Sequence, residues 1–176
     1  MERILFVSLL AFAALVALWF APQVQRAVSE SPPNSATAKT CSVFPIGRVR
    51  QEGGRNLIVL DGKYQPGLLG LDEWSHVQVF WWFDQNDTPQ KRAVLQVHPR
   101  GDANNPLVGV FACRAPVRPN LIALTLCKIV SVKGNIVEVE RIDAFDGTPV
   151  LDLKPYAPGM DGATGVRVPK WAGPKP

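Results

Sequence analysis

A chain of 176 residues is long enough for one ordinary folded domain with additional segments. Hydrophobic residues make up 47% of it and charged residues 19%, which is typical of a globular protein. The net charge of +4 permits an anionic partner, but the basic residues are spread along the whole sequence, so a nonspecific basic RNA-binding module is not indicated.

The N-terminal part of the sequence indicates a targeting or membrane segment. Residues 4–20 are apolar apart from Ser8 and follow a short stretch that contains Arg3. Such a run fits the core of a signal peptide or a short membrane anchor, and we expect residues 1–21 to be one of these. An uncleaved anchor is favoured over a cleaved signal peptide, because no clean cleavage site follows the run. A buried core helix is the less favoured alternative.

The orientation of that segment determines where the protein is expected to act. Arg3 and Arg26 flank it almost evenly, so the orientation is open. We expect a membrane-anchored or exported, periplasmic or extracytoplasmic, protein, and attachment at the cytoplasmic face stays an open alternative. Residues 22–40 are rich in Pro, Ser, Ala and Thr and are predicted to form a flexible linker, so the folded domain begins near Cys41.

The rest of the chain has the pattern of short β-strands, with Gly, Asn, Asp or Pro between most of them. The predicted strands are residues 42–50, 56–62, 77–83, 93–99, 107–114, 121–132 and 135–142. A hairpin turn is expected at Lys133-Gly134-Asn135, and only a brief helical turn at residues 67–74. This number of short strands predicts a mainly β fold, a small barrel over residues 41–161, followed by a Pro/Gly-rich extended tail over residues 162–176.

Several classes of site lack the residues that their chemistry needs. Two histidines, and three cysteines without a CxxC pair, indicate neither a histidine metal cluster nor a structural zinc site. Ser75 and His76 are adjacent, and on a strand their side chains would point to opposite faces, so no nucleophile–base pair is expected. For Cys41, Cys113 and Cys127, one disulfide with one free thiol and three small buried side chains both stay open.

The aromatic run Phe80-Trp81-Trp82-Phe83 has two interpretations. It could be a stacking platform for nucleic-acid bases. It is more typical of a barrel strand that is buried on one face and packed against a helix or a subunit on the other, and we favour that interpretation.

Two stretches carry more polar residues than barrel strands require. One, residues 109–126, places two arginines beside prolines. The other, residues 142–161, carries Asp143 and Asp146 on a turn that Gly147 permits. An ion-pair network that joins two loops is the structural interpretation, and a ligand pocket is the functional one.

Four stretches together resemble the TsaA-like (TrmO) family: "IGRVR", "GLDEWSHVQVFWWF", "GVFACRAPVRPN" and "DAFDGTPVLDLKPYAPGMD" occur in the family's order and spacing. The resemblance covers roughly residues 43–161. It implies a small β-barrel that forms a homodimer and binds S-adenosyl-L-methionine near the subunit interface. It also implies a methyltransferase that methylates N6 of threonylcarbamoyladenosine at position 37 of tRNA.

Site residues follow from the resemblance by their place in these stretches. The cofactor contacts that it implies are Gln85, Arg114, Leu124, Asp143, Ala144, Phe145 and Asp146. Arg118 and Asn120 match the "RPN" element and are expected to face the methyl acceptor. No catalytic residue is implied.

The sequence also departs from the family pattern. Residues 51–56 are too short for the family's Pro-x-Gln cofactor loop, and the similar Gln65-Pro66-Gly67 triplet comes after the second strand. Asp84 stands where the family has a histidine. Cys113, Leu121 and Ala123 are the other departures. With the N-terminal segment, they keep a second interpretation open: an exported or membrane-tethered binding module that has kept the barrel and lost methyl transfer.

Overall fold

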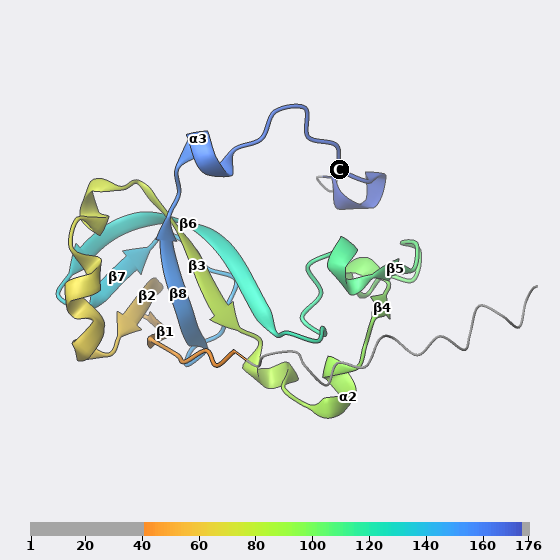
Figure 1. Cartoon of the computed structure of the whole chain (residues 1–176), viewed down its shortest axis with the longest axis horizontal. Coiled ribbons are helices and arrows are strands. Elements are labelled where there is room, and N and C mark those ends of the chain that lie inside the picture. The colour runs from red at the N-terminus through yellow and green to blue at the C-terminus, as the bar shows by residue number, and fades with distance from the viewer. Residues whose placement is uncertain (1–40, 174–176) are drawn as a thin grey trace, which may run out of the picture. The chain divides into compact units, whose positions relative to one another are not determined.

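The computed structural model describes residues 41–173, which fold mainly as β-structure (Figure 1). The strands are β1 Gly47–Glu52, β2 Arg55–Leu60, β3 His76–Trp82, β4 Gln96–Val97, β5 Val108–Gly109, β6 Ile122–Lys133, β7 Ile136–Val139 and β8 Pro149–Pro155. The short α-helices are α2 Pro89–Arg92 and α3 Pro158–Asp161. Turns of 3-10 helix lie at Gly62–Leu68, Leu71–Glu73, Asp84–Asn86, Pro99–Gly101, Val110–Ala112 and Lys170–Ala172.

Six of the strands form a closed antiparallel barrel in the order β1-β2-β7-β6-β3-β8. β4 and β5 pair with each other outside it, and Figure 1 shows them to one side of the barrel. Closure removes the unpaired edges that an open sheet of this size would expose. The mainly β fold and the small barrel predicted from the sequence are confirmed.

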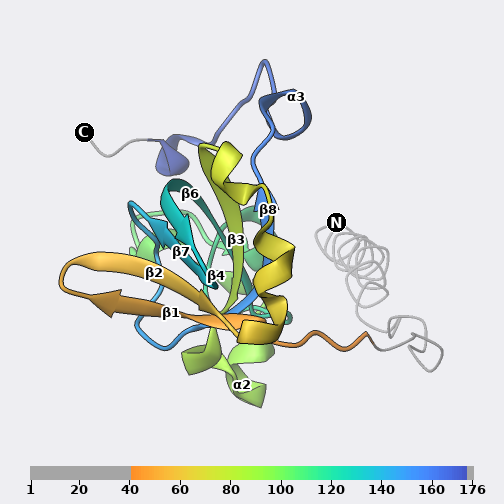
Figure 2. The same ribbon diagram turned by 90° about the vertical axis from the view of Figure 1, so that its left-hand side faces the viewer.

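Strand β6 is the longest strand of the barrel, at 12 residues, and it changes its pairing partner along its length. Its first half pairs with β3 and its last part with β7, and the register shifts between Ile129 and Ser131. Such an irregularity bends a strand and increases its twist. Figure 2 shows the β1–β2 hairpin, whose strand β2 pairs with β7 on the side away from β1.

β-Branched side chains fill the barrel interior, as the alternating pattern of the strands requires. The fully enclosed ones are Val49, Ile58, Val77, Val79, Val137, Val139 and Val150, each at most 2% exposed. Leu68 and Leu71 join this core from the 3-10 turns that precede β3. Those turns confirm the helical segment expected at residues 67–74, and the turn between β6 and β7 confirms the expected hairpin.

Several strand predictions were wrong. Residues 107–114 keep only the two-residue strand β5 before a 3-10 turn, and residues 93–99 keep only β4. β8 was interpreted as part of a polar loop.

The expectation that the side chains of Ser75 and His76 point to opposite faces was also wrong. Ser75 Oγ lies 2.9 Å from Nδ1 of His76. Ser75 lies in a bend before β3, so the side-chain alternation of a strand does not apply to it.

The three cysteines are free thiols. Cys127 faces the core from β6, and burial raises the pKa of its thiol to about 11. This thiol is therefore a protonated core side chain at neutral pH.

The expectations for residues 1–21 and 22–40 lie outside the described residues. Within residues 41–173, no helix is both long and apolar enough to cross a membrane.

Gly47 provides a test of the barrel closure. A Cβ at this position would lie 2.6 Å from Cα of Leu60 and in closer contact with the carbonyl oxygen of Val59. We expect Gly47→Ala to lower the free energy of unfolding by about 1–3 kcal/mol, because backbone on two strands must move to admit the methyl group. Urea unfolding of the full chain measures this change.

Gly67→Ala is the matched control, since an added Cβ there meets nothing within 4 Å. Equal stabilities of the two variants would show that the β1–β2 approach does not limit the barrel.

Candidate functional site

A cavity of about 520 Å³ lies beside the barrel, where β3 ends. Four separate parts of the sequence line it, at residues 51, 81 and 83–86, 114 and 116, and 142–145 and 148. It contains most of the residues singled out from the sequence, namely Gln85, Arg114, Asp143, Ala144 and Phe145. The fold thus brings both polar stretches to one place.

A neighbouring groove of about 370 Å³ shares Trp81, Phe83, Arg114 and Asp143 with this cavity. It follows β6 from Ile122 to Leu126, so it contains Leu124. Arg114 and Asp143 are therefore the charged side chains common to both hollows.

Arg114 is held at the centre of the site by the barrel. Its Nη1 donates a hydrogen bond to the carbonyl oxygen of Leu124 at 3.2 Å. No ion pair within residues 41–173 involves Arg114 or Asp143. A guanidinium has five N–H donors, so most of those of Arg114 are available to a ligand.

Asp146 has a different task from Asp143, although they are three residues apart. One oxygen of Asp146 accepts a hydrogen bond from the backbone N–H of Gln51 at 2.9 Å, and the other lies 3.4 Å from Nη1 of Arg50. Gly147, at a φ of 81°, lets the chain turn there, and its N–H donates to the Val49 carbonyl at 2.8 Å. Asp146 fixes the loop to β1, and this leaves Asp143 to line the cavity.

Arg118 and Asn120, expected to face an acceptor, are placed apart from the cavity. Nη2 of Arg118 donates to the carbonyl oxygens of Val110 at 2.6 Å and Cys113 at 3.0 Å. Arg118 therefore fixes the loop that carries Arg114, and it reaches only the groove. Asn120 is exposed and lines neither hollow.

The turn that carries Gln85 is fixed by a cluster around Asp87. This carboxylate accepts hydrogen bonds from Nε of Arg92 at 2.7 Å and from Nε1 of Trp82 at 3.1 Å. These bonds, that from Arg92 above all, lower the pKa of Asp87 below its ordinary value. Arg92 also donates to the Pro119 carbonyl at 3.0 Å, which joins the turn to the "RPN" element.

Gln51 is a site residue that the sequence reasoning missed. Its side-chain amide donates to the Ala144 carbonyl at 3.1 Å and lines the cavity. It lies near the end of β1, just before the turn that leads into β2. Gln65 lies in a 3-10 turn that borders a different hollow.

Aromatic rings form the apolar wall of the site. Trp81 and Phe83 meet edge to face at 4.8 Å between ring centroids, and Nε1 of Trp81 donates to Oγ1 of Thr125 at 3.0 Å. The aromatic run is thus a barrel strand with one buried ring, whose end borders the cavity. Asp84 adds a carboxylate to the lining, whereas Leu121 and Ala123 are buried.

No cluster of three or more metal-ligating side chains occurs in the described part of the chain. The cavity instead offers a guanidinium, carboxylates, side-chain amides and aromatic walls. Those groups suit an organic ligand that carries both charge and an apolar part.

The fold and the site define a small closed β-barrel with a polar and aromatic cavity beside it. The profile of the tRNA-methyltransferase O N-terminal domain matches residues 34–162, and the chain belongs to this family.

Similar proteins support the assignment. A probable S-adenosyl-L-methionine-binding protein of Methanocaldococcus jannaschii is 42% identical over 117 residues, which cover 66% of this chain and 93% of the relative. The tRNA (adenine(37)-N6)-methyltransferase of Mus musculus is 43% identical over 104 residues, 59% of this chain but 23% of the relative. A crystal structure of TrmO from Pseudomonas aeruginosa matches with a TM-score of 0.61 and 30% identity over 78% of this chain and 64% of that chain.

Asp146 and Asp143 provide a test of the division between loop anchor and cavity lining. We expect Asp146→Ala to lower the free energy of unfolding by about 0.5–1.5 kcal/mol, because the N–H of Gln51 loses its acceptor. Asp146→Asn should cost less, since its amide oxygen can still accept. Asp143→Ala should leave stability almost unchanged. Chemical denaturation of the three variants measures these changes. Equal decreases in the free energy of unfolding for Asp146→Ala and Asp143→Ala would contradict the assignment of Asp146 as the loop anchor.

Proposed function

We propose that this chain is an S-adenosyl-L-methionine-dependent methyltransferase whose cofactor binds in the 520 Å³ cavity. The observation that carries the proposal is the meeting of Arg114 and Asp143 at one aromatic-walled cavity of a barrel that belongs to this family. The names of relatives, which include S-adenosyl-L-methionine-binding proteins and a tRNA methyltransferase, support it.

The residues present fit the chemical groups of the cofactor. Its carboxylate matches the free donors of Arg114, and its ammonium and ribose hydroxyls match Asp143 and the amides of Gln51 and Gln85. Its adenine matches the aromatic side chain of Phe83 at the cavity wall. A volume of about 520 Å³ lies in the range of small-molecule sites.

When bound, the cofactor supplies a methyl group that its sulfonium has already activated. The protein then needs to hold the reacting groups in line and to exclude water. Arg114, fixed by the Leu124 carbonyl, and the loop fixed by Asp146 are suited to that positioning task. We assign the cofactor contacts to Gln51, Gln85, Arg114, Asp143, Ala144 and Phe145, with Leu124 and Asp146 acting through their anchoring bonds.

The acceptor that we propose is an adenine of tRNA, with threonylcarbamoyladenosine at position 37 as the finer assignment that the family resemblance implies. The name of the Mus musculus relative supports the adenine at position 37. A barrel that has lost methyl transfer and only binds is the alternative that the experiments below separate from this one.

A homodimer is part of the same proposal. Ile122, Leu124, Leu126 and Val130 alternate along β6 on the outside of the barrel and are 37–57% exposed. Phe80 and Trp82 of β3 lie opposite Leu124 and Ile122 in the sheet. This apolar face continues into the groove beside Arg114, so a second copy is the occupant that would cover both.

Cofactor binding is measured by calorimetry on the full chain. We expect S-adenosyl-L-methionine to bind, and Arg114→Ala to weaken binding about 10- to 100-fold through the loss of charge-assisted hydrogen bonds. Arg167→Ala is the matched control, because Arg167 is exposed and lines none of the hollows described here. If the folded chain does not bind S-adenosyl-L-methionine at millimolar concentration, the proposal is refuted. If the chain binds the cofactor but does not methylate tRNA, the alternative of a barrel that only binds is supported.

Dimer formation is tested on the outer face of β6. We expect Leu126→Glu to shift the chain towards the monomer in sedimentation velocity, since a buried carboxylate would oppose association. Leu69→Glu changes an equally apolar residue that is 95% exposed in the loop before β3, and should leave the mass unchanged. A wild-type chain that sediments as a monomer at high micromolar concentration would refute this interface.

A further inference from the structure

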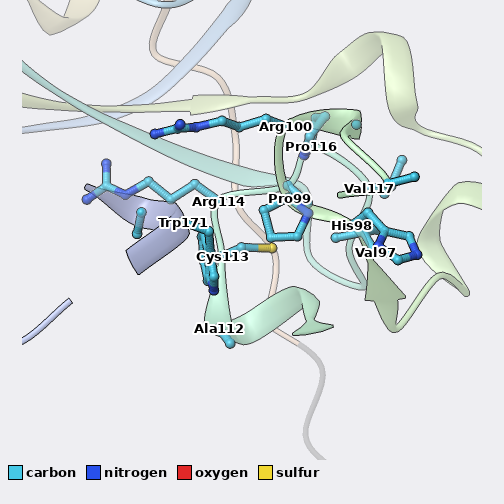
Figure 3. Close-up of a pocket in the computed structure, with 14 residues that line it drawn as sticks. Val97, His98, Pro99, Arg100, Ala112, Cys113, Arg114, Pro116, Val117 and Trp171 are labelled. Atoms are coloured by element: carbon cyan, nitrogen blue, oxygen red, sulfur yellow. The ribbon is translucent and has the colours of Figure 1, made fainter. Parts of the chain in front are cut away.

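The described residues also form a hollow that is larger than the proposed cofactor cavity. A cavity of about 1010 Å³ is lined by residues 97–101 and 103, residues 112–117 and residues 171–172 (Figure 3). It shares Arg114 and Pro116 with the 520 Å³ cavity. Ligands in the two would therefore be neighbours, on either side of Arg114.

The C-terminal segment closes one side of this cavity. Trp171 lines it from the 3-10 turn Lys170–Ala172, and Nη2 of Arg100 donates to the next carbonyl, that of Gly173, at 3.1 Å. Arg100 has a φ of 62°, the left-handed region that a residue with a Cβ seldom adopts. Trp171 lies beyond residues 34–162, so the family profile does not extend to it.

His98 presents a hydrogen-bond acceptor to the same cavity. Its Nδ1 lies 2.7 Å from the carbonyl oxygen of Asn105. A carbonyl oxygen can only accept, so Nδ1 carries the proton and Nε2 of the neutral ring has a lone pair. Nε2 has no partner within residues 41–173, and the exposed ring lines the cavity.

The charge of the lining is positive. Arg100 and Arg114 border the cavity, their side chains extend in the same direction in Figure 3, and neither belongs to an ion pair of the described residues. No Asp or Glu is among the lining residues. Prolines, alanines and valines supply most of the remaining wall. An anion with a flat apolar ring is the ligand that this combination suits.

We propose that this cavity binds an adenine nucleotide, with its ring against Trp171, its exocyclic amino group donating to Nε2 of His98 and its phosphate at Arg100. The proposal rests on the proposed function in one respect: it makes this cavity the acceptor site beside the cofactor. Trp171 and His98 are then the residues that select an amino-bearing purine. Stacking on an aromatic ring and a phosphate beside a guanidinium are common means of holding single nucleotides.

Binding of adenosine 5′-monophosphate to the full chain tests the site. We expect Trp171→Ala to weaken binding at least tenfold in calorimetry, whereas Trp74→Ala, which removes an exposed indole outside the cavity, leaves it unchanged. Purine riboside 5′-monophosphate lacks the amino group and should bind about tenfold more weakly than the adenosine nucleotide. His98→Ala should abolish that difference, and His76→Ala should preserve it.

The outcomes separate this site from the cofactor cavity. Two results would place adenosine monophosphate in the cofactor cavity and overturn the site. One is equal binding to wild type and Trp171→Ala, and the other is displacement of the nucleotide from both proteins by S-adenosyl-L-methionine. Absence of nucleotide binding also overturns it, while cofactor binding in the same samples would leave the proposed function standing. If the chain binds the nucleotide through Trp171 but binds no cofactor, the nucleotide site is supported and the proposed methyltransferase function is refuted.

Discussion

The absence of a side chain at Gly47 lets the barrel close next to its site. β1 pairs with β8 at only two residues, Gly47 and Arg48. If a side chain at position 47 pushed β1 away from β2, the short β1–β8 pairing could do little to hold β1 in place. Two and four residues further along β1, the Val49 carbonyl and the N–H of Gln51 hold the loop that carries Asp143. Strand β1 therefore has two roles. It closes the barrel, and it positions the loop whose Asp143 carboxylate lines the cavity.

Arg114 extends this coupling to the other side of the site. Its loop is fixed by Arg118 through two backbone carbonyls, and its guanidinium by the carbonyl of Leu124 in β6. Arg114 borders both cavities and the groove between the barrel strands and the loops. A charge held by backbone acceptors keeps its position without a neutralising carboxylate, which leaves its field available to a bound anion. Hydrogen bonds to the main chain thus position Arg114, and its positive charge stays available to interact with a ligand.

Local patterns explain which parts could be predicted. The alternation of Val and Ile, and the glycine at the hairpin between β6 and β7, are properties of neighbouring residues, and they predicted most of the barrel. β8 was missed because prolines stand at both of its ends, yet Pro149 is tolerated as the first residue of a strand. Residues 107–114 have high β propensity, but the bonds from Arg118 turn the chain there instead. Gln51 and Trp171 escaped prediction because their roles depend on contacts far apart in sequence, such as that between Arg100 and Gly173.

The bond between Arg114 and Leu124 joins the site to the outer face of the barrel. In a chain that self-associates through β6, covering that strand removes water that competes for the Leu124 carbonyl, and the bond from Arg114 gains strength in the lower dielectric. Ligand affinity and subunit association then share a coupling free energy, and each must promote the other by the same factor. Dilution would loosen the pocket as well as the assembly, so the apparent dissociation constant of a ligand becomes a function of protein concentration.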